Sequence, residues 1–338
     1  MKSNISYEQQ TQDFSTFGDK LLQHTDTLFS IQQNRVFKPI TIQLAPTESC
    51  DSNCSFCSVA GRDITQKIPF EKIKKGLQEF KVLGAKALEI TGGGNPLLYR
   101  DGEYTIEDVI CFAYSIGYKI GVITNSANLS KYISPACAEY ISWVRISLIK
   151  LDEGLGIEDY NFNPLPEVKI GLSYIIYEKT TSDTIKKIAQ LVEMHPSIKF
   201  VRVAADCLTE DSLKIKEDWG DIIETLDNYK KFFIKEINDN FHPYSQGCWV
   251  GMIRPYWVWN GVYICTSHVL KHRNYDETFK LCDCDNILTT WNAMNGRFAA
   301  GGNPYDIDIS KECWHCYYYS NNKILSSVIR EMPDKEFV

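Results

Sequence analysis

A regular alternation of short apolar runs and amphipathic runs along residues 40–230 constrains the fold more than any other feature of the sequence. The apolar runs have the length of buried strands, and the runs between them have helical periodicity. Alternation at this spacing indicates a parallel sheet with helices outside it. The expected strands are Ile40–Leu44, Lys86–Thr91, Lys119–Thr124, Ile141–Leu148, Val168–Tyr177 and Ile198–Val203. We therefore predict an α/β fold in which functional residues gather at the carboxyl ends of the strands.

The helices expected in this region are Ile68–Leu83, Ile106–Ile116, Ser130–Tyr140, Ser182–His195 and Asp218–Lys230. Ahead of the first strand, residues 1–38 form a polar extension with one helical segment, Phe17–Ile31. We expect this segment to lie across the underside or the open side of the sheet structure.

Charge and hydropathy exclude some functions. Basic residues number 36 and acidic residues 43, and a net charge of −7 disfavours non-specific binding to nucleic acid or to an anionic membrane. The amino terminus has no basic start followed by an apolar stretch, and no run reaches the length of a membrane span. We therefore expect a cytoplasmic protein with no membrane partner.

Three of the twelve cysteines lie within eight residues, as Cys50, Cys54 and Cys57. Cytosolic thiols are kept reduced, so clustered cysteines indicate metal ligands rather than disulfides. Soft thiolates suit zinc or an iron–sulfur cluster, and structural sites of both kinds normally use four protein ligands. A zinc knuckle lacks its fourth ligand, because the next downstream candidate is Cys111 and only His24 precedes the trio. Three thiolates leave one metal position open to a substrate or a cofactor.

This C-x3-C-x2-C spacing, with the aromatic Phe56 before the third cysteine, resembles the motif of the radical S-adenosylmethionine (radical SAM) enzymes. The resemblance implies a partial (β/α)6 TIM-like barrel, placed at residues 39–237, and a [4Fe–4S] cluster whose open iron binds SAM. It also implies reductive cleavage of SAM to a 5′-deoxyadenosyl radical that abstracts hydrogen from a substrate C–H bond. A reducing partner such as flavodoxin or ferredoxin is implied as well.

A glycine run follows the second expected strand, at Gly92, Gly93 and Gly94. Glycines let backbone N–H groups approach a ligand closely. The run resembles the family's GGE motif, with Gly93, Gly94 and Asn95 in register, and this implies a contact with the amino group of SAM. Asparagine replaces the usual glutamate, and its oxygen still accepts a hydrogen bond, without the gain from a charge.

Other SAM contacts are implied by position within the family. Asn125 and Ser147 lie at the ends of two strands that carry polar contacts to the ribose and the carboxylate of SAM in the family. Capping or turn roles are the alternative for both residues. Phe56 is expected to place its backbone near the adenine.

A second cysteine set consists of Cys248, Cys265, Cys313 and Cys316. Asn260-Gly261, between the first two, predicts a hairpin turn. The set resembles the auxiliary-cluster domain of radical SAM enzymes, of the SPASM or shorter twitch type, and implies a second [4Fe–4S] cluster in a small α+β domain. The alternatives are structural zinc and unligated thiols. The resulting domains are residues 1–38, 39–237, 238–330 and a tail at 331–338.

The remaining cysteines are assigned to the core. Cys282 and Cys284 precede an expected helix at 287–295, and we expect core or supporting roles, with cluster ligation as the alternative. Cys111, Cys137 and Cys207 lie in apolar contexts typical of ordinary buried thiols.

Three side chains are candidate catalytic groups. Lys150 and Asp152 follow the strand Ile141–Leu148, where relatives often place residues that handle the substrate, and solvated charges are the alternative. His268 is a candidate acid or base, with an exposed strand-end histidine as the alternative.

The substrate class is the least constrained inference. A small carbohydrate- or nucleotide-like molecule is favoured over a ribosomal peptide, because residues 1–38 are too few for the winged-helix recognition domain often fused to peptide-modifying relatives. We expect the auxiliary cluster to assist oxidation or bond formation. Peptide modification, and modification or isomerisation of a nucleobase in DNA or RNA, are alternatives, although the acidic balance does not indicate nucleic acid. A non-catalytic metal-binding module is a remote alternative.

Overall fold

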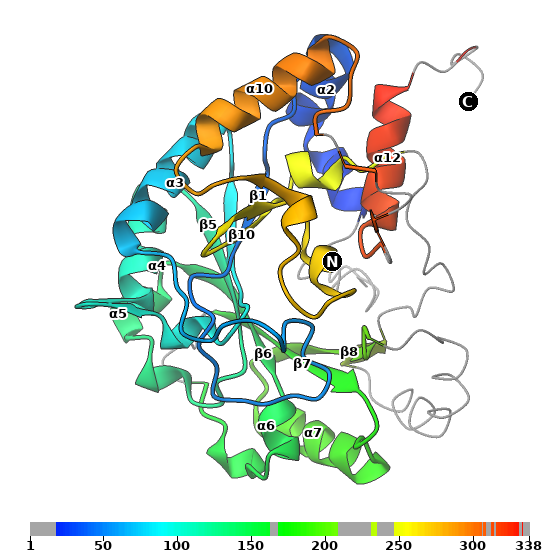
Figure 1. Ribbon diagram of the computed structural model, residues 1–338. Coiled ribbons are helices and arrows are strands. Elements are labelled where there is room, and N and C mark those ends of the chain that lie inside the picture. The colour runs from blue at the N-terminus through cyan, green and yellow to red at the C-terminus, as the bar shows by residue number, and fades with distance from the viewer. Residues whose placement is uncertain are drawn as a thin grey trace, which may run out of the picture.

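The computed structural model describes residues 18–162, 168–208, 231–234, 247–305, 307–308, 312–313, 316–330 and 333. A curved sheet runs through these residues, with the strand order β12-β11-β10-β1-β2-β5-β6-β7-β8-β9 (Figure 1). Its parallel part consists of β1 (Thr41–Leu44), β2 (Ala87–Ile90), β5 (Lys119–Thr124), β6 (Ile141–Ser147), β7 (Lys169–Ile176), β8 (Ile198–Ala205) and β9 (Phe232–Ile234). The six strands expected from the sequence are confirmed, and β9 adds a seventh. This is the α/β fold that the alternation predicted, in the partial-barrel form that the family resemblance implied.

Helices connect the strands and cover the convex side of the sheet (Figure 1). The helices of the described residues are α2 (Thr25–Asn34), α3 (Phe70–Leu83), α4 (Ile106–Ser115), α5 (Pro135–Ala138), α6 (Ile149–Asp152), α7 (Ser182–Met194), α10 (Ile287–Ala299) and α12 (Tyr319–Ile329). None of these helices combines the length and the apolarity that a membrane span needs. The expected helix Asp218–Lys230 lies outside the described residues.

The expected helix Ser130–Tyr140 is wrong in extent. The chain forms a 3-10 turn at Leu129–Lys131 and then only the short α5. Pro135 explains the break, because the residue before a proline is pushed out of the helical region. Ser134 takes an extended conformation there, and its side chain accepts a hydrogen bond from the Cys137 N–H as the cap of a new helix.

The carboxyl-terminal segment extends the sheet of the barrel. Strand β10 (Tyr256–Val258) pairs in parallel with β1, and β11 (Gly261–Tyr263) and β12 (Lys280–Cys282) follow as antiparallel strands. The hairpin turn predicted at Asn260-Gly261 connects β10 to β11. Both cysteine sets are therefore attached to one hydrogen-bonded sheet.

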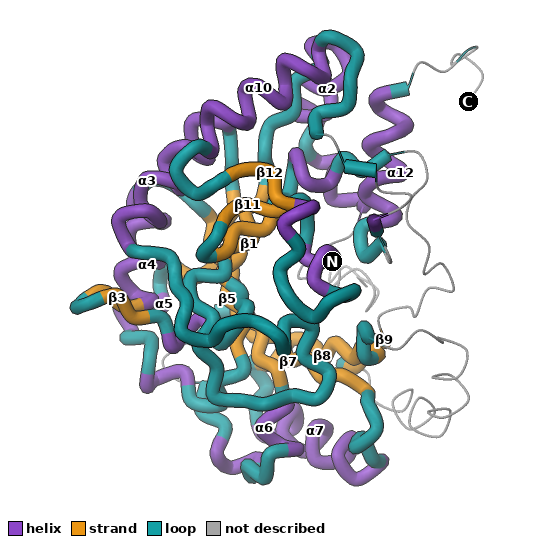
Figure 2. Tube along the Cα trace, in the orientation of Figure 1, coloured by secondary structure: helices purple, strands orange, loops and turns teal. Residues whose placement is uncertain are grey.

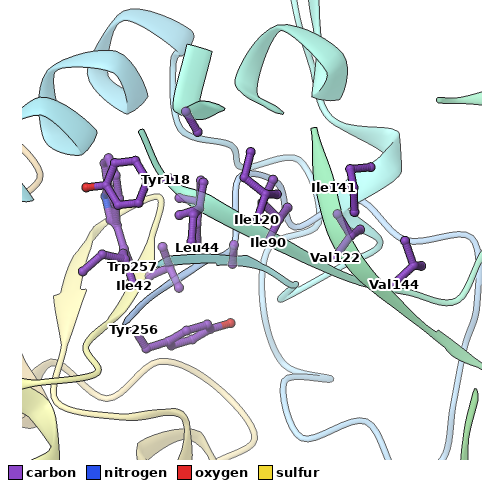
Figure 3. Close-up of a cluster of buried hydrophobic side chains, with 14 of the residues drawn as sticks. Ile42, Leu44, Ile90, Tyr118, Ile120, Val122, Ile141, Val144, Tyr256 and Trp257 are labelled. Atoms are coloured by element: carbon purple, nitrogen blue, oxygen red, sulfur yellow. The ribbon is translucent and has the colours of Figure 1, made fainter. Parts of the chain in front are cut away.

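The main core lies between the sheet and its helices. Alternate residues of the central strands, including Ile42, Ile90 and Val122, are fully buried there (Figure 3). Trp257 of β10 packs beneath α3, where a side chain at Gly76 would overlap its ring. Helix α10 lies beside α3 in Figure 1, so segments about 200 positions apart share this layer.

Two aromatic rings fill the lower interior of the barrel. A Cβ atom at Gly121 of β5 would lie 2.2 Å from the Trp143 ring, and one at Gly171 of β7 would lie 2.3 Å from the Phe200 ring. Each ring therefore crosses a neighbouring strand at a glycine. These close approaches form the floor below the more polar upper interior.

The amino-terminal extension closes the underside. A 3-10 helix (Gly18–Gln23) and α2 pack against α12, and Phe37 exchanges backbone hydrogen bonds with the Asn295 side chain of α10. Lys20 and His24 line a cavity of about 280 Å³ with the amino ends of β1, β2, β5 and β6. The expected location of this helical segment across the underside is confirmed.

We predict that Gly121→Ala destabilises the fold by about 1–3 kcal/mol, because the added methyl group overpacks the floor. The matched control is Gly296→Ala in α10, where nothing lies within 4 Å of the added atom. That change is expected to stabilise the protein by up to about 1 kcal/mol through helix propensity. Denaturant unfolding of both variants measures the difference, and equal midpoints would contradict the packing of Trp143 on Gly121.

Candidate active site

The first cysteine trio lies in the long loop, residues 45–69, that connects β1 to α3 (Figure 2). Cys50, Cys54 and Cys57 are each half-buried. Burial, together with the neighbouring Cys57 and Cys50, raises the pKa of the Cys54 thiol to about 12. The three thiols thus lie close enough together to influence one another's ionisation, at the carboxyl end of the sheet.

Two arginines, Arg62 within the loop and Arg273 from the carboxyl-terminal segment, hold the end of this loop. Arg273 donates hydrogen bonds to the Ser55 carbonyl at 2.6 Å and to the Cys57 carbonyl at 2.9 Å. Arg62 donates to the Cys57 sulfur at 3.4 Å and to the Val59 carbonyl at 2.9 Å. A guanidinium offers several donors in a rigid plane, so each arginine fixes more than one atom.

Lys150, at the start of α6, holds the middle of the loop. Its ammonium group donates to the Asp51 carbonyl at 2.7 Å and pairs with the Glu153 carboxylate at 3.0 Å. Glu153 in turn accepts hydrogen bonds from the Ser52 hydroxyl and the Asn53 N–H. These contacts make Lys150 an anchor of the cysteine loop, and its catalytic role stays a prediction.

Asp152 connects to the aromatic side of the loop. It accepts hydrogen bonds from the hydroxyls of Tyr174 at 3.0 Å and Tyr177 at 3.1 Å. Burial raises the pKa of the Asp152 carboxyl above its usual value. The Tyr177 ring meets the Phe56 ring edge-on with centroids 4.8 Å apart. A carboxyl group with a raised pKa beside the loop keeps Asp152 a candidate for proton transfer.

The glycine run packs against the segment that leads into the loop. A side chain at Gly93 would collide with the Glu48 carboxylate, and one at Gly94 with the Ser49 carbonyl. Gly94 and the next residue donate backbone hydrogen bonds to Thr47 and Ser49. Residues without a Cβ are therefore required here by close backbone contact.

Asn95 is fully engaged by the protein. Its oxygen accepts from the Thr124 hydroxyl at 2.8 Å and from the Leu97 N–H at 3.2 Å, and it caps a 3-10 turn. Its amide nitrogen donates to the Ser126 hydroxyl at 2.8 Å and to the Asp51 carboxylate at 3.2 Å. The predicted contact of Asn95 with an ammonium group must compete with these bonds. Asp51, which sequence reasoning missed, supplies a half-exposed carboxylate at this point.

Asn125 and Ser147 lie at the ends of neighbouring strands β5 and β6. Asn125 donates to the Ser52 hydroxyl at 2.8 Å and faces the Cys50 sulfur at 3.8 Å. Among the described residues, its side-chain oxygen is buried with no hydrogen-bond partner. A buried acceptor without a donor fits a bound cofactor that carries ammonium or hydroxyl donors, as SAM does.

The second set converges from three segments of the chain. Burial, together with the neighbouring Cys316 and Cys313, raises the pKa of the Cys248 thiol to about 12. Burial raises the pKa of Cys265 well above its usual value, again with the other three thiols as neighbours. The Asn322 side chain donates to the sulfurs of Cys248 and Cys316 at 3.9 and 3.7 Å. N–H groups aimed at sulfur are typical of iron–sulfur sites.

Thiolate donors such as these suit zinc or an iron–sulfur cluster. Within the described ranges, no group of three His, Cys, Asp or Glu side chains is arranged to hold one metal ion. Thiolates that bind a four-iron cluster each take a different iron, so their sulfurs stand farther apart than ligands of one zinc. The donor chemistry of both sets fits [4Fe–4S] clusters.

His268 is not an exposed strand-end residue, and that alternative is wrong. It is 3% exposed and stacks on the Tyr263 ring with centroids 4.3 Å apart. Burial lowers the pKa of its imidazole to about 4, and its Nδ1 donates to the Cys265 carbonyl. A neutral, enclosed imidazole suits support of the second cysteine set better than acid catalysis at neutral pH.

Cys282 and Cys284 are both buried in the core. The Trp257 indole donates to the Cys284 sulfur at 3.2 Å. These positions agree with the core role expected for them.

Of the other three cysteines, expected to be ordinary buried thiols, Cys137 confirms the expectation and Cys111 contradicts it. Cys137 is buried, but Cys111 is exposed. Cys207 is half-buried just after β8, hydrogen-bonded to Tyr317 and close enough to Cys57 to interact electrostatically. It therefore lies between the two cysteine sets.

A buried ion pair behind the glycine run was also missed. Glu48 has no exposed surface, pairs with Arg62 at 3.3 Å and accepts a hydrogen bond from the Tyr275 hydroxyl at 2.6 Å. Burial raises the pKa of Glu48 to about 7, against the effect of both partners. Nothing in the sequence signals this cluster, because Tyr275 lies 227 positions away.

Comparison with known proteins gives one family and a shared fold. The model of the Radical SAM superfamily matches residues 44–159. A curated relative from Archaeoglobus fulgidus, named Probable GTP 3′,8-cyclase, is 32% identical over 112 residues. That match covers 33% of this chain and 36% of the relative, so the chain spans about a third of the relative's length.

Among solved structures, Streptococcus suis SuiB bound to S-adenosylmethionine has a TM-score of 0.52 at 16% identity, covering 88% of this chain and 78% of SuiB. SuiB bound to the precursor peptide SuiA also has a TM-score of 0.52, at 17% identity, and the match covers 83% of this chain and 72% of SuiB. The protein anSMEcpe with bound AdoMet has a TM-score of 0.50 at 12% identity, and the match covers 84% of this chain and 88% of anSMEcpe. At these identities the likeness shows the fold, which is the partial barrel described above.

The contacts of Lys150 with the cysteine loop predict that this side chain helps the loop to retain iron. In the iron-loaded protein, Lys150→Met is expected to speed the loss of iron to a chelator several-fold, because the loop loses its link to Glu153 and the Asp51 carbonyl. Lys186→Met, which removes an exposed pair on α7, is the matched control and should match the unaltered protein. Unchanged iron release together with lost turnover would instead support a purely catalytic lysine.

Proposed function

We propose that this chain is a member of the radical SAM superfamily, whose model matches residues 44–159, and that it is an enzyme that cleaves SAM reductively at a cluster held by Cys50, Cys54 and Cys57. The bound cluster and SAM would supply a 5′-deoxyadenosyl radical for hydrogen abstraction from a substrate C–H bond. The convergence of three thiols with the unsatisfied oxygen of Asn125 carries this proposal. An electron donor such as flavodoxin or ferredoxin is part of it.

The residues around the trio bind and orient these groups. Arg62, Arg273 and Lys150 fix the backbone of the loop, so the thiols are held in place before metal arrives. Asn125 and Asp51 offer acceptors for a cationic amino acid group. Preorganisation of this kind reduces the ordering cost of binding.

We propose a second [4Fe–4S] cluster at Cys248, Cys265, Cys313 and Cys316. Four mutually close thiols with an amide donor at two sulfurs support it. By the family resemblance, a cluster at this place accepts an electron from a substrate radical. That role suits oxidation or bond formation.

The proposed substrate is a small carbohydrate- or nucleotide-like molecule. A relative whose name gives GTP as the substrate supports the nucleotide class, over the third of the chain that it matches. Peptide modification is the second candidate, because SuiB, of similar fold, has been solved with a precursor peptide. Modification or isomerisation of a nucleobase in DNA or RNA ranks below these two, and a non-catalytic metal-binding module ranks last.

Anaerobic reconstitution with iron and sulfide tests the main proposal. We expect about eight irons per chain, for two four-iron clusters. Reduction in the presence of SAM should yield 5′-deoxyadenosine, and Cys54→Ala should abolish that product. Tight zinc binding with no SAM cleavage would identify the non-catalytic module instead.

The second cluster has its own test. Cys313→Ala combined with Cys316→Ala should remove about four irons, half of the total, while 5′-deoxyadenosine formation persists. The matched control is Cys282→Ala, which alters a buried core thiol and should leave the iron count unchanged. Loss of all iron from the double variant, or of none, would contradict a separate auxiliary cluster.

A further inference from the structure

We propose that Arg145 and Arg202 form a subsite inside the barrel that binds an anionic group of the substrate, a carboxylate or a phosphate. The inference deepens the proposed function and rests on it for the identification of the ligand as substrate. It depends on where the two side chains point and on how the charges inside the barrel balance.

Both arginines face the interior. Trp143 and Phe200 form the interior floor over Gly121 and Gly171. Arg145 follows Trp143 by two residues on β6, and Arg202 follows Phe200 by two residues on β8. Residues two apart on a strand share a face, so both guanidinium groups lie one step above the floor. Only β7 separates their strands.

The interior carboxylate is already paired. Glu89 of β2 accepts two hydrogen bonds of 2.9 Å from Arg254 and one of 2.8 Å from the Gln43 side chain. Both bonds come from one guanidinium nitrogen of Arg254, and charge-assisted hydrogen bonds of this kind are strong. The Glu89–Arg254 pair is therefore close to neutral.

Among the described residues, no carboxylate forms a salt bridge with Arg145 or Arg202. The charge of Glu89 acts to raise the pKa of both guanidinium groups, but its ion pair and hydrogen bonds go to Arg254 and Gln43. The Arg145 Nε is buried with no hydrogen-bond partner. Burial and the neighbouring Arg145 lower the pKa of Arg202 to about 9. Both arginines are partly buried, and a partly buried charge with no ion pair among the described residues is costly, so the pair indicates a ligand of opposite sign.

The subsite opens toward the two cysteine sets. Arg202 lies near Cys207 and Tyr317, and Cys207 lies near Cys57. An anion held by the arginines would therefore place the rest of a small molecule beside the first cysteine set. Arginine is suited to this task because its planar donors bind carboxylate and phosphate bidentately and it resists deprotonation.

The experiment measures binding of inorganic phosphate and of acetate to the reconstituted protein, by thermal unfolding at constant ionic strength. We expect at least one of these anions to raise the unfolding temperature. Arg145→Met and Arg202→Met should each weaken that anion's binding at least tenfold. Without anion, both variants should unfold at or above the temperature of the unaltered protein, because a partly buried charge with no ion pair among the described residues has been removed. Arg100→Gln, at an exposed arginine, is the control and should change nothing.

A second measurement separates the substrate from the cofactor, since SAM also carries a carboxylate. SAM affinity should change less than twofold in both arginine variants. A tenfold loss of SAM affinity would assign the arginines to the cofactor and overturn the proposal. So would the absence of any response to both anions, or a response that both variants retain. Anion binding that depends on the arginines in a protein without SAM cleavage would refute the proposed activity and leave the anion subsite intact.

Discussion

The hold of three cationic side chains on the cysteine loop is the constraint on which the rest of the site depends. A loop that offers three thiols to one cluster must keep its backbone in place without regular secondary structure. Here Arg273, Arg62 and Lys150 donate to its carbonyl oxygens, and Glu153 accepts from its donors. These bonds take the place of the backbone hydrogen bonds that a helix or a sheet would provide. They also connect the loop to α6 and to the carboxyl-terminal segment.

The continuous sheet fixes the second cysteine set relative to the first. Strand β1 leads into the cysteine loop and pairs with β10, two strands from the end of the sheet. Cys265 follows β11 directly, so hydrogen-bonded neighbours carry both sets. A substrate bound between them would meet a geometry set by backbone pairing rather than by flexible linkers.

Local patterns predicted the parts of the structure that depend on local interactions. The six parallel strands and the hairpin at Asn260-Gly261 follow from periodicity and turn chemistry. The helix expected at Ser130–Tyr140 is shorter because Pro135 starts a new helix and keeps Ser134 extended. Burial of His268 and exposure of Cys111 depend on tertiary packing that no window of sequence contains. The same holds for Arg273, whose partner Cys57 lies 216 positions away.

Asn322 has a consequence for how metal binding and the docking of α2 are related. Its oxygen accepts the N–H groups of Trp249 and Val250 while its nitrogen faces two sulfurs, and its helix α12 supports the amino-terminal α2. By thermodynamic linkage, whatever occupies those sulfurs strengthens α12 and, through it, the docking of α2. If the second cysteine set binds a cluster as proposed, binding of that cluster and docking of α2 against α12 are thermodynamically linked.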